Sequence, residues 1–288
     1  MNPIGDPRSP PKAGAQERCR DFLRTLAGRL DAPLPIAEAA LAIAALERPR
    51  TPVGRYQEHL DLLAADIGAR ASRAGSVAAK VDLLNDVILG KHGYRGDSET
   101  YDDLQNANLM RVIDRRKGLP VALGILYIHA ARAQGWHIAG LGFPSHFLLR
   151  VEQDGERAIL DPFHGGRTRD AAELRELLKA IGGNAAELEP QHYAVVSDRE
   201  VLLRLQNNVK VRLLQGQQTE RALAAIDAML LFAPDHAALW REAGLLHAHL
   251  GNLRAAIAAL ETFLTHERDD AVRHQTALLV QQLRGHLN

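Results

Sequence analysis

A histidine and an aspartate, His146 and Asp161, are the residues of this chain whose types and spacing are best suited to chemistry. A carboxylate beside an imidazole fixes its tautomer and stabilises its charged form, which is the base-and-orienter half of a nucleophilic triad. The same pair can act as a general base on water. A third interpretation is a structural hydrogen bond that only stiffens the fold.

The sequence between these two residues indicates how they meet. Asp154-Gly155 is the strongest short signal for a hairpin, and it separates two expected strands, residues 146–151 and 157–161. A two-residue turn places Leu148 opposite Asp161, so His146 and Asp161 lie on one face as diagonal neighbours, about 5–8 Å apart between their β-carbons. A three-residue loop would shift the register and send the two side chains to opposite faces.

The nucleophile of such a triad is missing from its expected place. Gly118-Leu119-Pro120 precedes an apolar helix expected over residues 121–134, which Gly135 ends. This arrangement resembles the transglutaminase-like and papain-like pattern, in which Gly-x-Cys begins the core helix, a His opens a strand and an Asp ends the next strand before Pro. The cysteine position falls on Pro120. A helix N-terminus lowers the pKa of a thiol, but it also suits proline, whose missing N–H costs nothing there.

Other side chains offer no evident replacement. Cys19 is the single cysteine and belongs to the N-terminal region, and Ser145 adjoins His146, but neighbours on a strand point to opposite faces. Tyr127 and His129 lie on the apolar helix, where packing is the expected role. We assign no metal, because no diagnostic spacing such as H-E-x-x-H occurs. The side chains that could serve as ligands are His129, His146, Asp161 and His164.

The elements that position this pair predict an α+β fold. Residues 1–15 are expected to form a disordered tail, followed by a domain over residues 16–200. Its helices are expected at residues 16–30, 36–46, 51–71, 77–89, 107–115, 121–134 and 171–181, and its strands at 137–141, 146–151 and 157–161. Thr51 and Pro52 form a plausible N-cap and first residue for the third helix. Because helices lead into a small antiparallel sheet, the pattern is not alternating βαβ.

The last third of the chain, residues 201–288, indicates a helical repeat. Residues 206–234 align with 240–268 at an offset of 34 residues, which is the tetratricopeptide (TPR) period. Two repeats are fewer than an array needs alone, and a last helix over residues 271–287 would cap the stack. The positions that match the consensus are Ala222 and Pro234 in the first copy, and Trp240, Gly244, Gly251 and Ala256 in the second.

Four motifs together resemble the SirB family of bacterial proteins, which join a transglutaminase-like domain to a C-terminal TPR tail. They are Leu104-Gln105-Asn106-Ala107-Asn108-Leu109, Arg115-Arg116-Lys117-Gly118-Leu119-Pro120, Phe143-Pro144-Ser145-His146-Phe147-Leu148 and Asp161-Pro162-Phe163-His164-Gly165-Gly166. The resemblance covers residues 20–285. It implies a transglutaminase-like (papain-like) core with N-terminal helices, followed by an all-α TPR-like region, and it implies no established substrate.

Composition and charge indicate which classes of partner and which compartment to expect. The chain has 35 lysine and arginine residues together and 35 aspartate and glutamate residues together. Because its formal net charge is zero, no general attraction to nucleic acid or acidic membranes is expected. The first twenty residues contain no apolar segment, so no signal peptide is expected, and one cysteine fits a reducing, cytoplasmic compartment.

Two functions follow as hypotheses. The first is a non-catalytic protein that binds protein or peptide through the TPR region and the cleft at His146, without a cofactor. The alternative is a hydrolase or acyl transferase that uses the His146–Asp161 pair as general base.

Overall fold

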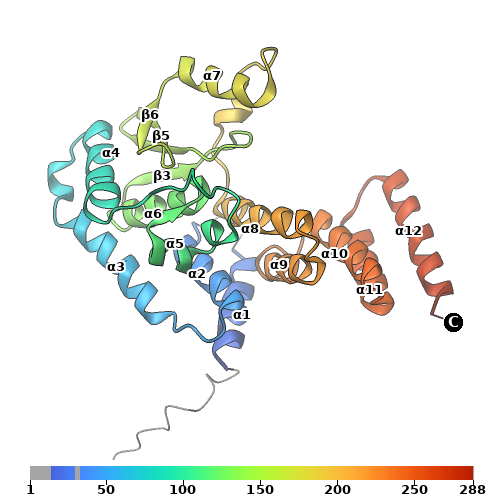
Figure 1. The fold of residues 1–288 in the computed structure, drawn as a ribbon. Coiled ribbons are helices and arrows are strands. Elements are labelled where there is room, and N and C mark those ends of the chain that lie inside the picture. Colours follow the sequence, from blue (N-terminus) through green and yellow to red (C-terminus); the bar gives the residue numbers. More distant parts are fainter. Residues whose placement is uncertain (1–13, 30–32, 288) are drawn as a thin grey trace, which may run out of the picture. The chain divides into compact units, whose positions relative to one another are not determined.

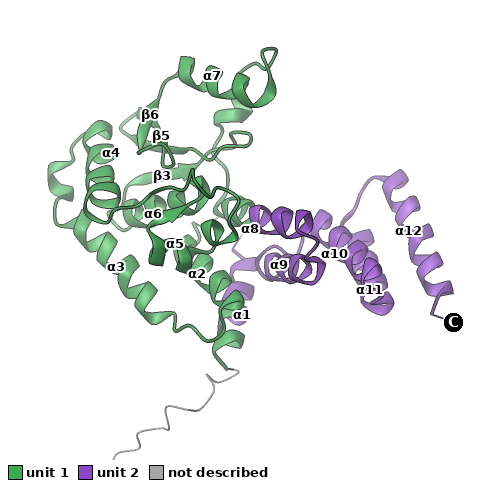
Figure 2. Cartoon of the chain, in the orientation of Figure 1, with its two compact units in different colours: residues 1–19, 31–205 green, residues 20–30, 206–288 purple. Residues whose placement is uncertain are grey.

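The computed structural model describes residues 14–29 and 33–287, which form two compact units (Figures 1 and 2). The first unit comprises Met1–Cys19 and Asp31–Leu205, and the second comprises Arg20–Leu30 and Gln206–Asn288. The sequence did not indicate that the segment Arg20–Leu30 groups with the C-terminal helices. Of the expected tail, residues 1–13 lie outside the described residues, whereas residues 14 and 15 already belong to α1 (Gly14–Ala27).

Helices make up most of the first unit, as the sequence predicts. They are α2 (Ile36–Glu47), α3 (Gly54–Gly68), α4 (Val77–Asn85), α5 (Leu109–Arg115), α6 (Pro120–Arg132) and α7 (Ala171–Gly182), with shorter helical turns at Ala71–Arg73, Asp86–Lys91, Leu104–Ala107 and Pro190–Tyr193. The expected start of the third helix at Thr51-Pro52 is wrong. The N–H of Thr51 donates to the carbonyl of Arg48 in a turn, and α3 begins three residues later, at Gly54.

Short polar side chains set the starts of three of these helices. Ser76 accepts a hydrogen bond from the N–H of Ala79 at the start of α4, and Asn108 accepts one from Arg111 at the start of α5. Asp170 and Glu173 form a reciprocal capping box at the start of α7. Each side chain satisfies a backbone donor that the first helical turn leaves without a partner.

The four-stranded sheet of the first unit is antiparallel, with strand order β3-β4-β5-β6. Three of its strands, β3, β5 and β6, are labelled in Figure 1. Its strands are β3 (His137–Gly140), β4 (Leu149–Gln153), β5 (Glu156–Asp161) and β6 (Arg167–Arg169). The predicted register is confirmed, because Gln153 pairs with Glu156 and Val151 with Ala158 across a two-residue turn. Asp154 and Gly155, at that turn, have φ angles of +51° and +85°. This positive φ is what a type I′ turn requires, and it suits Asp-Gly.

Strand β4 is shorter than predicted. The sequence placed its start at His146, but the ladder begins at Leu149, and His146 lies in the loop before it. In that loop Ser145 has φ +54°, and the N–H of His146 donates to the carbonyl of Pro144 at 2.7 Å. A left-handed residue followed by such a tight turn cannot continue a strand.

Helix α6 is the buried centre of the first unit, as its apolar sequence predicts. Eleven of its thirteen residues are buried, and Gly124 allows the loop before β4 to approach it. A β-carbon at Gly124 would lie 2.3 Å from the ring of Phe147, which is itself fully buried. The helix therefore fixes the position of the chain immediately after His146.

The start of α6 is held by the motif around Asn106. The carbonyl of Asn106 accepts the N–H of Leu119, and its side-chain oxygen accepts a hydrogen bond from Arg115 at 2.8 Å. Arg115 also donates to the fully buried carboxylate of Asp97 at 2.7 Å. Two short parallel strands, β1 (Arg95–Gly96) and β2 (Lys117–Gly118), complete this support for the first turn of α6.

The second unit is all-α, and α8 (Asp198–Gln215) runs into it from the first. It continues with α9 (Thr219–Phe232), α10 (Ala237–His249), α11 (Leu253–His266) and α12 (Asp270–Gly285). Gly244 lets α10 and α11 approach closely, because a β-carbon there would lie 2.6 Å from a carbon of Leu260. The indole N–H of Trp240 donates to the carbonyl of Pro234. These contacts give the predicted repeat positions a structural role.

Within residues 14–29 and 33–287, the helices are all too short or too polar to span a bilayer.

Candidate functional site

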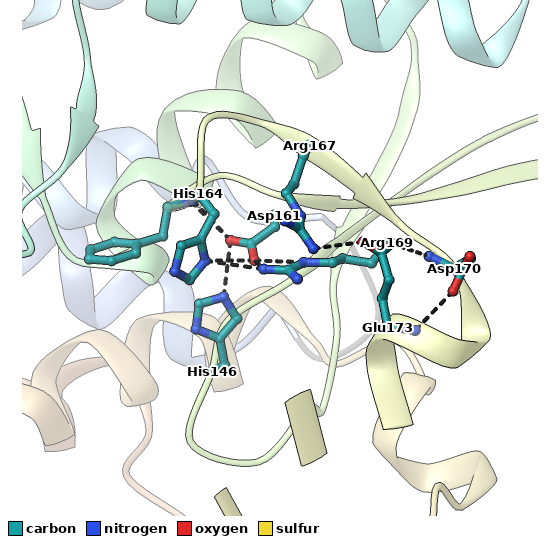
Figure 3. Close-up of polar contacts among 8 residues, drawn as sticks. His146, Asp161, His164, Arg167, Arg169, Asp170 and Glu173 are labelled. Carbon is teal, nitrogen blue, oxygen red and sulfur yellow. Dashed lines mark hydrogen bonds and ion pairs between the residues drawn. The ribbon is translucent and has the colours of Figure 1, made fainter. Parts of the chain in front are cut away.

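The carboxylate of Asp161, at the end of β5, is the centre of the candidate site (Figure 3). Its side chain is fully buried, and the His146 side chain is 10% exposed. Nε2 of His146 lies 3.0 Å from Oδ1 of Asp161. The two residues are therefore in hydrogen-bond contact, but His146 makes this contact from the loop before β4 and not from the sheet face that the sequence predicts.

Asp161 accepts hydrogen bonds on both oxygens. Oδ1 receives Nε2 of His146 and the backbone N–H groups of Phe163 and His164, the latter two at 3.2 Å. Oδ2 receives Nδ1 of His164 at 2.9 Å and two donors of Arg169, Nη2 at 2.6 Å and Nε at 3.1 Å. A buried carboxylate with this many partners is charged and rigidly held.

The electrostatics of the site follow from these contacts. Burial alone would raise the pKa of Asp161, but the hydrogen bonds and charges of His146, Arg169 and His164 outweigh it and hold the pKa of the carboxyl well below its usual range. The guanidinium of Arg169 is itself buried, with its side chain 9% exposed, so it is a fixed counter-charge. Asp161 is consequently ionised across the whole physiological pH range.

The loop after Asp161 is anchored to the helices of the first unit. Gly165 and Gly166 have φ angles of +70° and +65°, and a β-carbon at Gly166 would lie 2.0 Å from the side-chain oxygen of Asn85. The amide of Asn85 donates to the carbonyl of Gly166 at 2.7 Å, and the hydroxyl of Tyr127 donates to Asn85 at 2.8 Å. Tyr127 therefore acts through the loop and not on the pair.

The geometry of His146 determines what it can do chemically. Its Nε2–H donates to the ionised Asp161, so the lone pair of the neutral ring is on Nδ1. Among the described residues, Nδ1 of His146 has no hydrogen-bond partner. A ring oriented by a carboxylate through one nitrogen, with the other nitrogen available, has the arrangement of a general base.

The structure brings together only some of the residues that the sequence singled out. His146, Asp161 and His164 meet, whereas His129 lies near the carbonyl of Leu60 and the carboxylate of Glu38. Cys19 belongs to α1, and Pro120 is the first residue of α6. Ser145 directly precedes His146 in the loop before β4.

A metal ion would have to compete with protein donors at this cluster. His146, Asp161 and His164 each offer a ligand atom, and the three atoms lie within 4.8 Å of one another. The same carboxylate already carries two donors of Arg169 and two backbone N–H groups. Binding a cation beside a buried guanidinium is electrostatically unfavourable, and we assign no metal to this site.

Arg169 is the site residue that sequence reasoning missed. It lies on β6, a strand of three residues that the sequence did not indicate. In the register, Ile159 pairs with Arg169, and Ile159 is two residues before Asp161 on the same face. Extending the predicted hairpin by one more antiparallel strand after Gly165-Gly166 would have placed Arg169 diagonal to the carboxylate.

Comparison with known families defines the class of this protein. A family model described as the transglutaminase-like superfamily matches residues 54–207, and a tetratricopeptide repeat model matches residues 209–281. The chain therefore belongs to the transglutaminase-like superfamily and carries a C-terminal TPR region.

Curated relatives extend the likeness over most of the chain. A UPF0162 protein of Xylella fastidiosa is 29% identical over 264 residues, which cover 89% of this chain and 94% of that protein. Protein SirB1 of Salmonella typhimurium is 25% identical over 239 residues, or 83% of this chain and 88% of that protein. A UPF0162 protein of Vibrio cholerae is 29% identical over 82% of this chain and 88% of its own length. The predicted resemblance to the SirB family is confirmed.

Removal of the Asp161 charge is expected to destabilise the first unit in a pH-dependent way. We expect Asp161→Asn to lower the free energy of unfolding at pH 7 by about 3–5 kcal/mol, because it leaves Arg169 buried without its counter-charge. The folded-state pKa of Asp161 is depressed, so its contribution is fully present above the unfolded carboxyl pKa of about 4 and is lost as the pH falls through the folded value. Urea unfolding measured from pH 7 down to pH 3 should show that the difference in free energy of unfolding between wild type and Asp161→Asn becomes smaller as the pH falls.

The matched control is Asp86→Asn, which removes an exposed carboxylate paired with Arg70. It is expected to cost less than about 1 kcal/mol. Equal stability of wild type and Asp161→Asn at pH 7 would contradict the role given to this carboxylate.

Proposed function

We propose that this chain is a non-catalytic, transglutaminase-like binding protein that acts in protein recognition or regulation. In this proposal the TPR region and the cleft at His146 receive a protein or peptide partner. The His146–Asp161 pair orders the partner-binding surface and performs no acyl transfer.

The observation that carries the proposal is Pro120 as the first residue of α6. The helix start is where a triad of this class presents its thiol, and proline has no nucleophilic atom. The substitution leaves the helix intact, because the proline N would have no intrahelical partner in the first turn anyway. The first turn is also supported independently by Asn106, so the scaffold does not depend on a reactive residue at this position.

The second unit offers a separate place for a partner. A cavity of about 410 Å³ there is lined by Leu245, Leu260, Leu278 and Leu279, with Arg241 and Gln275 among its polar residues. Leu245 is 40% exposed and Leu278 is 47% exposed, so apolar surface on α10 and α12 is available to solvent. Exposed apolar residues of a helical repeat commonly contact peptide partners.

Wild type and His146→Ala are expected to be catalytically indistinguishable. With no nucleophile at Pro120, both should hydrolyse p-nitrophenyl esters and glutamine-containing peptide amides at the same rate, within about twofold. Circular dichroism would show that the variant is folded. A rate at least tenfold lower in both His146→Ala and His146→Gln would contradict the proposal.

One observation favours the alternative, a hydrolase that uses water. His146 is oriented through Nε2, and its Nδ1 has no hydrogen-bond partner among the described residues. Such a base could deprotonate a water molecule that attacks an ester or amide. The same assay separates the two functions, because only the hydrolase requires His146 for turnover.

Partner binding is expected to depend on the apolar cavity of the second unit. In pull-downs followed by mass spectrometry, Leu245→Glu and Leu278→Glu should each lose the proteins that wild type retains, because a charge in an apolar contact is costly. Leu62→Glu is the control, since Leu62 is 48% exposed but lies on α3 of the first unit. This role would be contradicted if all three variants retained the same proteins as wild type. It would also be contradicted if wild type itself retained no protein.

A further inference from the structure

A cavity of about 940 Å³ lies in the first unit. Neither His146 nor Asp161 lines it, although Arg169 both lines the cavity and donates to Asp161. Its lining residues come from β4, β5, β6, the start of α4, the first turns of α7 and the segment around Leu188 and Tyr193. The volume falls within the range typical of small-molecule sites, which is roughly 300–1,000 Å³.

Arginine dominates the charge of this cavity. Arg150, Arg157, Arg169 and Arg175 line it, against the two carboxylates of Glu156 and Asp170. The strand register explains the grouping, because Arg150 pairs with Ile159 and Ile159 pairs with Arg169, which places all three in one row across the sheet. The carboxylate of Asp170 is already engaged, since it accepts the N–H of Glu173 in the capping box of α7.

Two of these arginines are available for a ligand. Arg157 on β5 and Arg175 on α7 are exposed and make no hydrogen bond or ion pair with the described residues. Arg169, by contrast, is committed to Asp161. Arg150 is partly engaged, because its Nε lies 2.8 Å from a carboxylate oxygen of Glu152. That buried N–H makes no hydrogen bond within the described part of the chain. The cavity therefore presents cationic donors whose bonding capacity is unused.

The rest of the wall is apolar. Ile159, Leu174 and Leu188 line the cavity together with the ring of Tyr193, and Leu174 is buried. An inorganic anion would leave this surface without a partner, whereas a neutral apolar molecule would leave Arg157 and Arg175 without one. A ligand that satisfies both parts carries an anionic group at one end and an apolar body at the other.

We propose that this cavity binds small amphiphilic anions, with Arg157 and Arg175 holding a phosphate or carboxylate head and Ile159, Leu174 and Leu188 contacting the apolar body. Guanidinium groups pair with both kinds of head through parallel N–H donors. The proposal is independent of the function proposed for the His146 cleft and the TPR region, because it concerns a different set of residues. Its failure would leave that function unaffected.

The test uses the full chain and octyl phosphate below its micelle-forming concentration. Calorimetry should detect binding, and methyl NMR should show shifts at Ile159, Leu174 and Leu188. The double variant Arg157→Gln/Arg175→Gln should weaken binding at least about tenfold, because two charge-assisted hydrogen bonds are lost. Arg50→Gln is the matched control, since Arg50 is an exposed arginine of the same unit that does not line the cavity.

Three further ligands test which parts of the amphiphilic anion the cavity recognises. Octanoate in place of octyl phosphate distinguishes a carboxylate head from a phosphate head, and binding of either supports the proposal. Inorganic phosphate and 1-octanol, which carry only one half of the ligand, should each bind at least about tenfold more weakly than octyl phosphate. Equal affinity of 1-octanol, unchanged affinity in the double variant, or no shift at the three methyl-bearing residues would overturn the proposal.

Discussion

The carboxylate of Asp161 is a charge that the fold has removed from water, and the candidate site is arranged around it. A buried charge is stable only where it is paired and hydrogen-bonded on its remaining lone pairs. Both requirements are met from separate segments: the loop before β4 supplies His146, the loop after β5 supplies two backbone N–H groups and His164, and β6 supplies Arg169. This interaction ties three segments of chain into one arrangement (Figure 3).

The hairpin explains how much of this site could be predicted from the sequence. Asp154-Gly155 fixes a two-residue turn, so the register of β4 and β5 followed from local rules. The same rules predicted His146 on the sheet face of Asp161, whereas it reaches Asp161 from the loop before β4. The start of β4 did not follow from them, because the positive φ at Ser145 is a feature of one tight loop. Arg169 was missed for a similar reason, since a strand of three residues gives too short a pattern to recognise.

The start of α6 shows a different limit of prediction from the sequence. The apolar run and Gly135 predict a helix over residues 121–134, and the observed helix runs from Pro120 to Arg132. The support of that first turn by Asn106 could not be deduced, because it depends on a backbone contact between Asn106 and Leu119. The grouping of Arg20–Leu30 with the second unit is likewise a tertiary property, and no local propensity in that segment encodes it.

The central claim is that the ionised Asp161 fixes the ring of His146 with its proton on Nε2. The most direct measurement is the ¹⁵N spectrum of the His146 imidazole at a pH where the ring is neutral, because the two ring nitrogens have distinct shifts when one carries the proton. A single Nε2–H tautomer with a hydrogen bond to Asp161 is the result that this account predicts. An Nδ1–H tautomer, or an exchanging mixture of both tautomers in the wild-type protein, would contradict it.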